Sequence, residues 1–105
     1  MDFKTLQAQV HALAVHNGFW DGTPNLGEKV ALIHSELSEL LEAYRSGPLL
    51  LSEKSDQLTA EEEEFADIII RIMDLAQHRG VDLLRAARVK HAVNEQRPYR
   101  HGKAF

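Results

Sequence analysis

Residues 64–75 read EFADIIIRIMDL, and this stretch decides the fold class. Its apolar side chains fall at nearly every angle around a helix and leave only a narrow polar strip of Glu64, Asp67, Arg71 and Asp74. A helix that is apolar on almost all sides normally lies at the centre of a bundle. We therefore predict a central helix whose remaining apolar surface is covered by a second subunit.

Three further helices are predicted from apolar residues that recur at steps of three and four. The four predicted helices span about residues 2–16, 26–45, 60–79 and 82–96. Thr59 and Glu62 form a capping box at the start of the third helix, and a glycine closely follows each of the first three. No strand-like alternation occurs. The expected fold is a single all-α domain over residues 1–105, a four-helix bundle with a short C-terminal tail.

Composition excludes several classes of protein. The net charge of -4 argues against general binding of DNA or RNA, which usually requires a basic excess. The absence of cysteine excludes disulfides, zinc–thiolate sites and thiol catalysis. No apolar run approaches the roughly 20 residues of a membrane span, and the first residues do not resemble a secretory signal. We therefore expect a cytoplasmic protein that does not bind a membrane.

Two carboxylate pairs lie on successive predicted helices. Glu36 and Glu39 are three residues apart, as are Glu64 and Asp67. This spacing places both members of a pair on one helix face, so antiparallel packing can bring all four side chains together. At about 5 Å and an effective dielectric near 20, each like-charge pair costs roughly 3 kcal/mol, which a cation would offset. An all-oxygen set suits Mg²⁺ or Mn²⁺.

Cationic and aromatic residues complete the set of candidates. The fourth helix carries Lys90, Asn94 and Arg97 at a spacing that places them on one side, and Arg100, His101 and Lys103 follow in the tail. Such groups suit a polyphosphate. In the first loop, Trp20 and nearby Asn17 are candidates for contacts with a nucleobase.

The ordered set of motifs resembles the MazG-like family of all-α nucleoside triphosphate pyrophosphohydrolases. The resemblance rests on HSELSEL at residues 34–40, EFADIIIR at 64–71 and the later Lys90-His91, Asn94 and RPYRHGK at 97–103. These contain the family signature of ExxE followed, after a variable gap, by ExxD. The similarity extends over nearly the whole chain, including the NGFW segment at residues 17–20.

This resemblance implies that Glu36, Glu39, Glu64 and Asp67 bind Mg²⁺, with Mn²⁺ as a substitute. It implies hydrolysis of a (deoxy)nucleoside triphosphate between the α and β phosphates, with nucleotide-pool house-cleaning as the expected role. Lys90, Asn94 and Arg97 match family positions associated with substrate phosphates, to which the tail would add. Members of the family form dimers or tetramers with sites near subunit interfaces, so a homodimer or homotetramer is expected.

The expected mechanism assigns Glu39 as the general base that takes a proton from the attacking water, while metal and cations stabilise charge on the leaving pyrophosphate. Two alternatives remain open. The first is an enzyme like phosphoribosyl-ATP pyrophosphohydrolase, which would share the metal chemistry but not the substrate. The second is a non-catalytic helical interaction module, because glutamates on helices commonly form a solvated face and favour a helix N-terminus.

Overall fold

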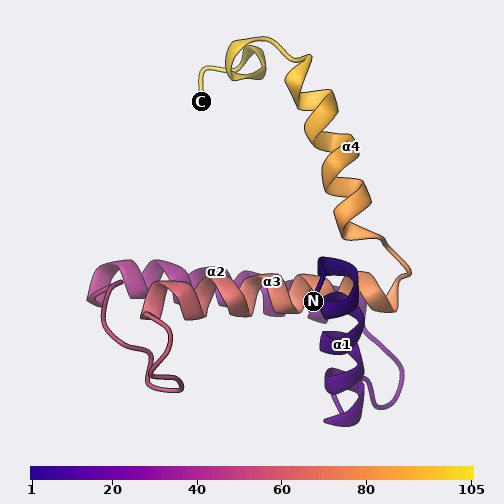
Figure 1. Ribbon diagram of the computed structural model, residues 1–105, viewed down its shortest axis with the longest axis vertical. Helices are drawn as coiled ribbons and strands as arrows, with labels where there is room; N and C mark the ends of the chain where they lie inside the picture. The colour runs from indigo at the N-terminus through magenta and orange to yellow at the C-terminus, as the bar shows by residue number, and fades with distance from the viewer.

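The computed structural model describes residues 1–105 and is all-helical. Its elements are α1 (Phe3–His16), α2 (Leu26–Ser46), α3 (Ala60–His78), α4 (Leu83–Glu95) and a 3-10 turn at Tyr99–Gly102 (Figure 1). The predicted all-α class with four helices is confirmed, and each helix end lies within one residue of its expected place. None of the helices combines the length and the apolar character needed to cross a membrane.

Each helix begins at a residue whose side chain accepts a hydrogen bond from a backbone N–H of the first turn. These bonds are Thr5 N to Asp2 (2.8 Å), Glu28 N to Asn25 (3.0 Å), Glu62 N to Thr59 (3.2 Å) and Arg85 N to Asp82 (3.0 Å). The Thr59 cap is reciprocal, because the Glu62 side chain accepts from Thr59 N at 3.0 Å. A cap of this kind stabilises a helix by about 1 kcal/mol.

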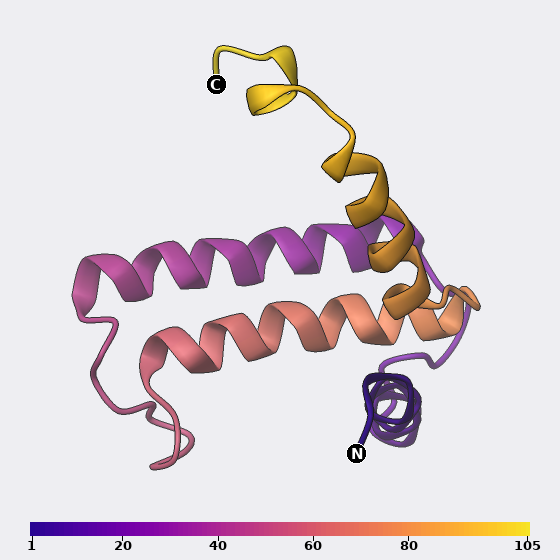
Figure 2. The ribbon, with the colours of Figure 1, turned by 45° about the horizontal axis from the view of Figure 1, so that its top comes forward.

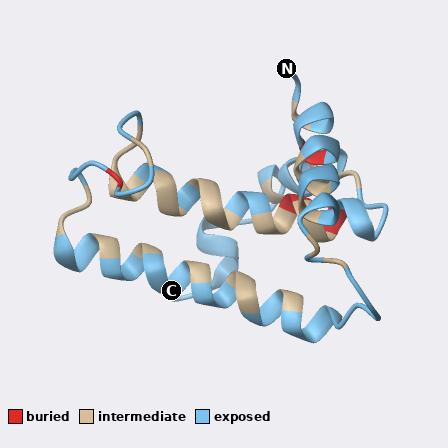
Figure 3. Cartoon of the chain, turned by 90° about the horizontal axis from the view of Figure 1, so that it is seen from below, coloured by how far each residue is buried: buried red, intermediate tan, exposed pale blue.

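Helices α2 and α3 lie side by side and antiparallel, and α1 crosses α3 (Figure 2). Three of the four buried residues, Gln7, Met73 and Ala76, come from α1 and α3. Figure 3 shows them gathered where the two helices meet, whereas most of the α2/α3 pair is only partly covered. The core is thus small, and α3 is the helix against which both α1 and α2 pack.

The fourth helix does not close the expected bundle within one chain. It leaves the end of α3 and points away from the α2/α3 pair, contacting chiefly α1 (Figures 1 and 2). Apolar periodicity predicts that a helix has a face to bury, but it does not say which chain supplies the partner. The accessible surface is 8012 Å², against about 6,000 Å² for a compact monomer of 11.9 kDa.

The connector between α2 and α3 is held in one conformation by backbone hydrogen bonds. Gly47 ends α2 with φ +142°, a conformation that side chains disfavour. Ser52 is buried, its N–H donates to Leu58 O at 2.9 Å, and its hydroxyl accepts from Lys54 N at 3.1 Å. An isolated antiparallel bridge joins Leu51 to Thr59. The connector therefore holds Lys54 beside the acidic pairs of α2 and α3.

Candidate functional site

Three carboxylates from the α2/α3 pair converge. Glu36, Glu64 and Asp67 each offer one oxygen, and these oxygens all lie within 4.8 Å of one another. Glu64 and Asp67 are one turn apart on α3, and Glu36 reaches them from α2. All three residues are partly buried. Antiparallel packing thus brings together three of the four acidic residues singled out in the sequence.

Glu39 is the fourth, and it borders the cluster on the solvent side. Its side chain is exposed and its oxygens lie outside the converging set. It stands one turn after Glu36 on α2, and its charge contributes to raising the pKa of Glu64. Glu39 therefore lies close enough to raise the pKa of Glu64, although its own oxygens are not among those that converge.

The pKa values of Glu64 and Asp67 are both raised above their ordinary range. Desolvation is the largest cause for each; repulsion follows, from Asp67 and Glu39 in the case of Glu64, and from Glu36 and Glu63 in the case of Asp67. Neither Glu64 nor Asp67 accepts a hydrogen bond from another side chain. Oxygen donors that repel one another and lack protein partners fit a hard divalent cation.

Two cations stand next to this cluster in the same chain. Arg71 Nε donates to Glu36 Oε1 at 2.8 Å, with both side chains partly covered. Lys54 forms no ion pair, yet it and Arg71 both lower the pKa of Asp67 against the other influences. Arg71 belongs to the polar strip visible in the sequence. Lys54 had no such signal, because it lies in an irregular connector.

A cavity of about 340 Å³ opens beside the carboxylates. One part of its wall is charged and includes Glu36, Asp67, Lys54 and Arg71. The rest comes mainly from α1, the first loop and α3, and consists of Val10, Leu13, Ala14, Asn17, Phe19, Lys29, Ile70, Asp74 and Leu75. Six of the 13 wall residues are apolar, and a wall that combines charged groups with apolar surface suits a ligand that carries both a charged group and a flat ring.

Asn17 lines this cavity, but Trp20 does not. The Trp20 ring stacks on His78 with centroids 4.1 Å apart, and Lys29 Nζ lies 4.2 Å from the Trp20 centroid. Its indole N–H donates to Asp74 Oδ1 at 2.8 Å. Protein groups thus occupy both the ring surface and the donor of Trp20, and its neighbour Phe19 contributes to the cavity wall instead.

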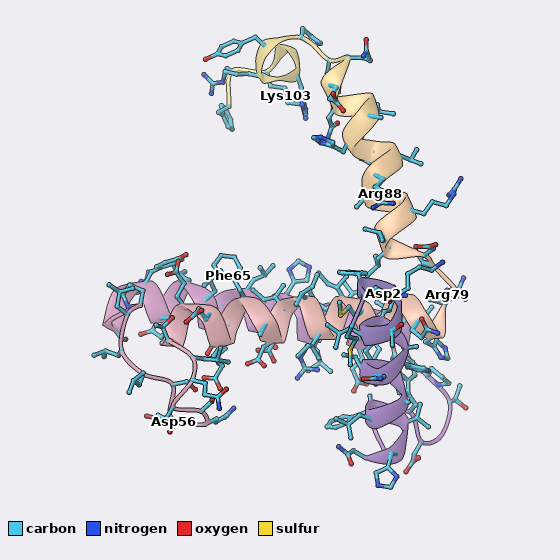
Figure 4. The ribbon with its side chains drawn as sticks, viewed as in Figure 1. Asp2, Asp56, Phe65, Arg79, Arg88 and Lys103 are labelled. Atoms are coloured by element: carbon cyan, nitrogen blue, oxygen red, sulfur yellow. The ribbon has the colours of Figure 1, made fainter.

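The structure does not bring the expected phosphate-binding residues to the carboxylates of their own chain. None of Lys90, Asn94, Arg97, Arg100, His101 and Lys103 lines the cavity. Figure 4 shows Arg88 and Lys103 on the arm formed by α4 and the tail, away from the α2/α3 pair. Five of the six are exposed; Asn94 is partly covered, and its enclosed Oδ1 has no hydrogen-bond partner.

The raised pKa values predict a dependence of stability on pH. Because Glu64 and Asp67 bind protons more tightly in the folded state than in the unfolded chain, their contribution is complete below the ordinary values of 4.5 and 3.8. It is lost as the pH rises through their folded pKa values. Without divalent ions, the free energy of unfolding of the wild type should therefore fall, relative to a Glu64→Gln/Asp67→Asn variant, as the pH rises above the ordinary pKa values of 3.8 and 4.5.

Urea denaturation of both proteins at a series of pH values from about 4 upward measures the difference, and subtracting the variant removes the contributions of the carboxylates that do not interact with Glu64 or Asp67. Added Mg²⁺ should abolish the relative loss if these groups hold the ion. A difference between the two proteins that stays constant with pH would contradict the raised pKa values of Glu64 and Asp67.

Comparison with known proteins adds no assignment: no family model, no curated protein and no solved structure matches the chain.

Proposed function

We propose that the protein is a Mg²⁺-dependent pyrophosphohydrolase that cleaves nucleoside triphosphates between the α and β phosphates. The observation that carries the proposal is the convergence of Glu36, Glu64 and Asp67, from two facing helices, within 4.8 Å at the edge of a cavity. The resemblance of the motifs to the MazG-like family supports the same activity. The products would be a nucleoside monophosphate and pyrophosphate.

In this proposal Glu36, Glu64 and Asp67 hold the metal. Bound Mg²⁺ would supply positive charge that attracts the triphosphate oxygens and makes a nearby water a better nucleophile. For Glu36 to serve fully as a ligand, its hydrogen bond with Arg71 at 2.8 Å must loosen. The freed guanidinium can then turn toward a phosphate, for which its two-pronged geometry is suited.

Glu39 takes the proton in the hydrolytic step. The water oxygen bonds to phosphorus, the bond from that phosphorus to the bridging oxygen breaks, and the proton passes to the Glu39 carboxylate. Glu39 suits this role because it is exposed and borders the cluster without belonging to the converging set. A general base must lie close to the metal, but its carboxylate must not be coordinated to the metal, because it has to accept a proton. Lys54 and Arg71 would stabilise charge on the departing pyrophosphate.

We further propose that the active form is an assembly of at least two copies. The chain exposes about 2,000 Å² more than a compact monomer of its mass, and burying this excess on two chains gives an interface of obligate-dimer size. Exposed apolar residues on the α2/α3 pair can supply the contact: Val30, Leu37, Leu41, Tyr44, Phe65 and Ile69. The arm formed by α4 and the tail of one copy would then reach the carboxylates of the other.

The test is an assay of pyrophosphate release from a panel of natural and modified nucleoside triphosphates, with Mg²⁺ and with Mn²⁺. We expect turnover of at least one nucleotide that depends on the metal, together with a rise in melting temperature on adding Mg²⁺ alone. Including phosphoribosyl-ATP in the panel distinguishes, in the same assay, an enzyme like phosphoribosyl-ATP pyrophosphohydrolase from one that acts on nucleoside triphosphates. A protein that gains no stability from Mg²⁺ and releases no pyrophosphate would instead be a non-catalytic helical module.

A further inference from the structure

One helix, α3, contributes polar residues to the cavity wall over two turns. Asp67, Arg71 and Asp74 all line the cavity from α3 and recur at helical spacing. Asp67 and Asp74 are seven residues apart, which corresponds to about 10 Å along the helix axis. That span resembles the reach from the innermost phosphate of an extended nucleotide to the far edge of its base. A nucleotide with its phosphates at Asp67 would therefore place its base near Asp74.

The side chain of Asp74 is held in place by two hydrogen bonds to one of its carboxylate oxygens. Its Oδ1 accepts from Trp20 Nε1 at 2.8 Å and from His11 Nδ1 at 2.7 Å. Trp20 is itself fixed between the stacked ring of His78 and the ammonium of Lys29. Two donors and a packed indole thus leave the Asp74 carboxylate little freedom to turn.

The second oxygen of Asp74 remains available to a ligand. Oδ2 makes no hydrogen bond within the protein, and it is not enclosed, since Asn94 Oδ1 is the one buried side-chain polar atom without a partner. The side chain is 17% exposed, and Asp74 belongs to the cavity wall. Two cations of that wall have other partners: Arg71 donates to Glu36 at 2.8 Å, and Lys29 Nζ donates to the carbonyl oxygen of Phe19 at 2.6 Å. A residue of the cavity wall therefore offers a carboxylate oxygen that no protein group occupies.

We infer that Asp74 selects nucleotides whose base carries an exocyclic amine, as cytosine and adenine do, an inference that rests on the proposed function. An ionised carboxylate can only accept hydrogen bonds, so it favours an amine and repels the carbonyl oxygen that uracil, thymine and hypoxanthine carry at the same position. The amide of Asn17, also on the wall, can donate to the neighbouring ring nitrogen. Trp20 and His11 act as positioning residues for Asp74.

Two matched pairs of substrates test this inference on the wild type. The nucleotides dCTP and dUTP differ chiefly in an amine against a carbonyl on the base, and dATP and dITP differ in the same way. For each pair that is turned over with Mg²⁺, kcat/KM should favour the amine by at least about tenfold, because a hydrogen bond to a charged group is at stake. A ratio within twofold would overturn the inference.

The variant Asp74→Asn provides a second test. Asn keeps Oδ1 as acceptor for Trp20 and His11, so its amide N–H₂ would face the cavity and donate to a carbonyl. We expect the dCTP to dUTP ratio of kcat/KM to fall by at least about tenfold, with a gain for dUTP rather than a uniform loss. The control Asp56→Asn makes the same chemical change at an exposed site on the α2–α3 connector and should leave the ratio unchanged.

These experiments separate the two levels of the proposal. If the wild type hydrolyses nucleotides with Mg²⁺ but the base ratios are near one, or if Asp74→Asn leaves them unchanged, the selection by Asp74 is wrong and the activity stands. If no nucleotide is turned over and Mg²⁺ alone gives no stabilisation, the proposed function fails and the inference fails with it. Should Asp74→Asn not fold, the wild-type ratios alone decide.

Discussion

Replacing Glu39 with glutamine should lower kcat by about a thousandfold while Mg²⁺ still stabilises the protein, an effect typical of losing a general base. Replacing Asp67 with asparagine should abolish both turnover and the stabilisation by Mg²⁺. The contrast follows from position. Asp67 lies within the set of oxygens that meet within 4.8 Å, whereas Glu39 is exposed and stands outside it.

The two roles are separated by measuring pyrophosphate release and the melting temperature of each variant with and without Mg²⁺. Glu42→Gln is a matched control, because Glu42 lies one turn beyond Glu39 on the same helix and makes only a long, exposed ion pair with Arg45. It should retain near-normal activity. A Glu39→Gln protein with wild-type turnover would remove Glu39 from the mechanism. Loss of Mg²⁺ stabilisation in that variant would make Glu39 a ligand instead of a base.

The local features of the fold were readable from the sequence because they depend on neighbours along the chain. Thr59 and Glu62 cap each other across a single turn, and Gly18, the glycine that closely follows the first helix, adopts φ +87°, the left-handed conformation common just after a helix C-terminus. Predicting that Glu36 converges with Glu64 and Asp67 required one further assumption, the antiparallel packing of the two helices that carry them. Two adjacent helices whose apolar stripes border acidic pairs bring those pairs together when they pack antiparallel.

Features that depend on irregular segments, or on how one helix is oriented relative to another, could not be predicted from the sequence in this way. Lys54 reaches the cluster only because the connector is pinned at Ser52, and no periodic pattern encodes that. The interaction of Trp20 with Asp74 joins residues 54 positions apart. The sequence shows only the loop setting of Trp20 and its polar neighbours, and the prediction of a nucleobase contact rests on these. The direction of α4 is decided by packing partners rather than by its own amphipathic pattern.

Because α4 points away from the carboxylates of its own chain, a second prediction with a large effect on turnover tests whether each site is shared between two copies. The variant Lys90→Gln/Arg97→Gln should lower turnover to less than about one hundredth, because two charged contacts to phosphate are lost. The variant Asp67→Asn should be inactive for a different reason, because it loses a carboxylate that is proposed to hold Mg²⁺. When the two proteins are unfolded together and refolded as a mixture, about a quarter of the sites should receive intact carboxylates from one chain and intact cations from the other.

The mixture should therefore recover about a quarter of the wild-type rate, although each component alone is almost inactive. A mixture of Asp67→Asn with Glu64→Gln is the matched control: both lesions lie in the same half of the site, so no pairing restores it. If the first mixture stays as inactive as the control, the cations of α4 act on the carboxylates of their own chain, and α4 must fold back on binding substrate. Recovery instead means that the outward course of α4 in Figure 1 is what allows one copy to complete the site of the other.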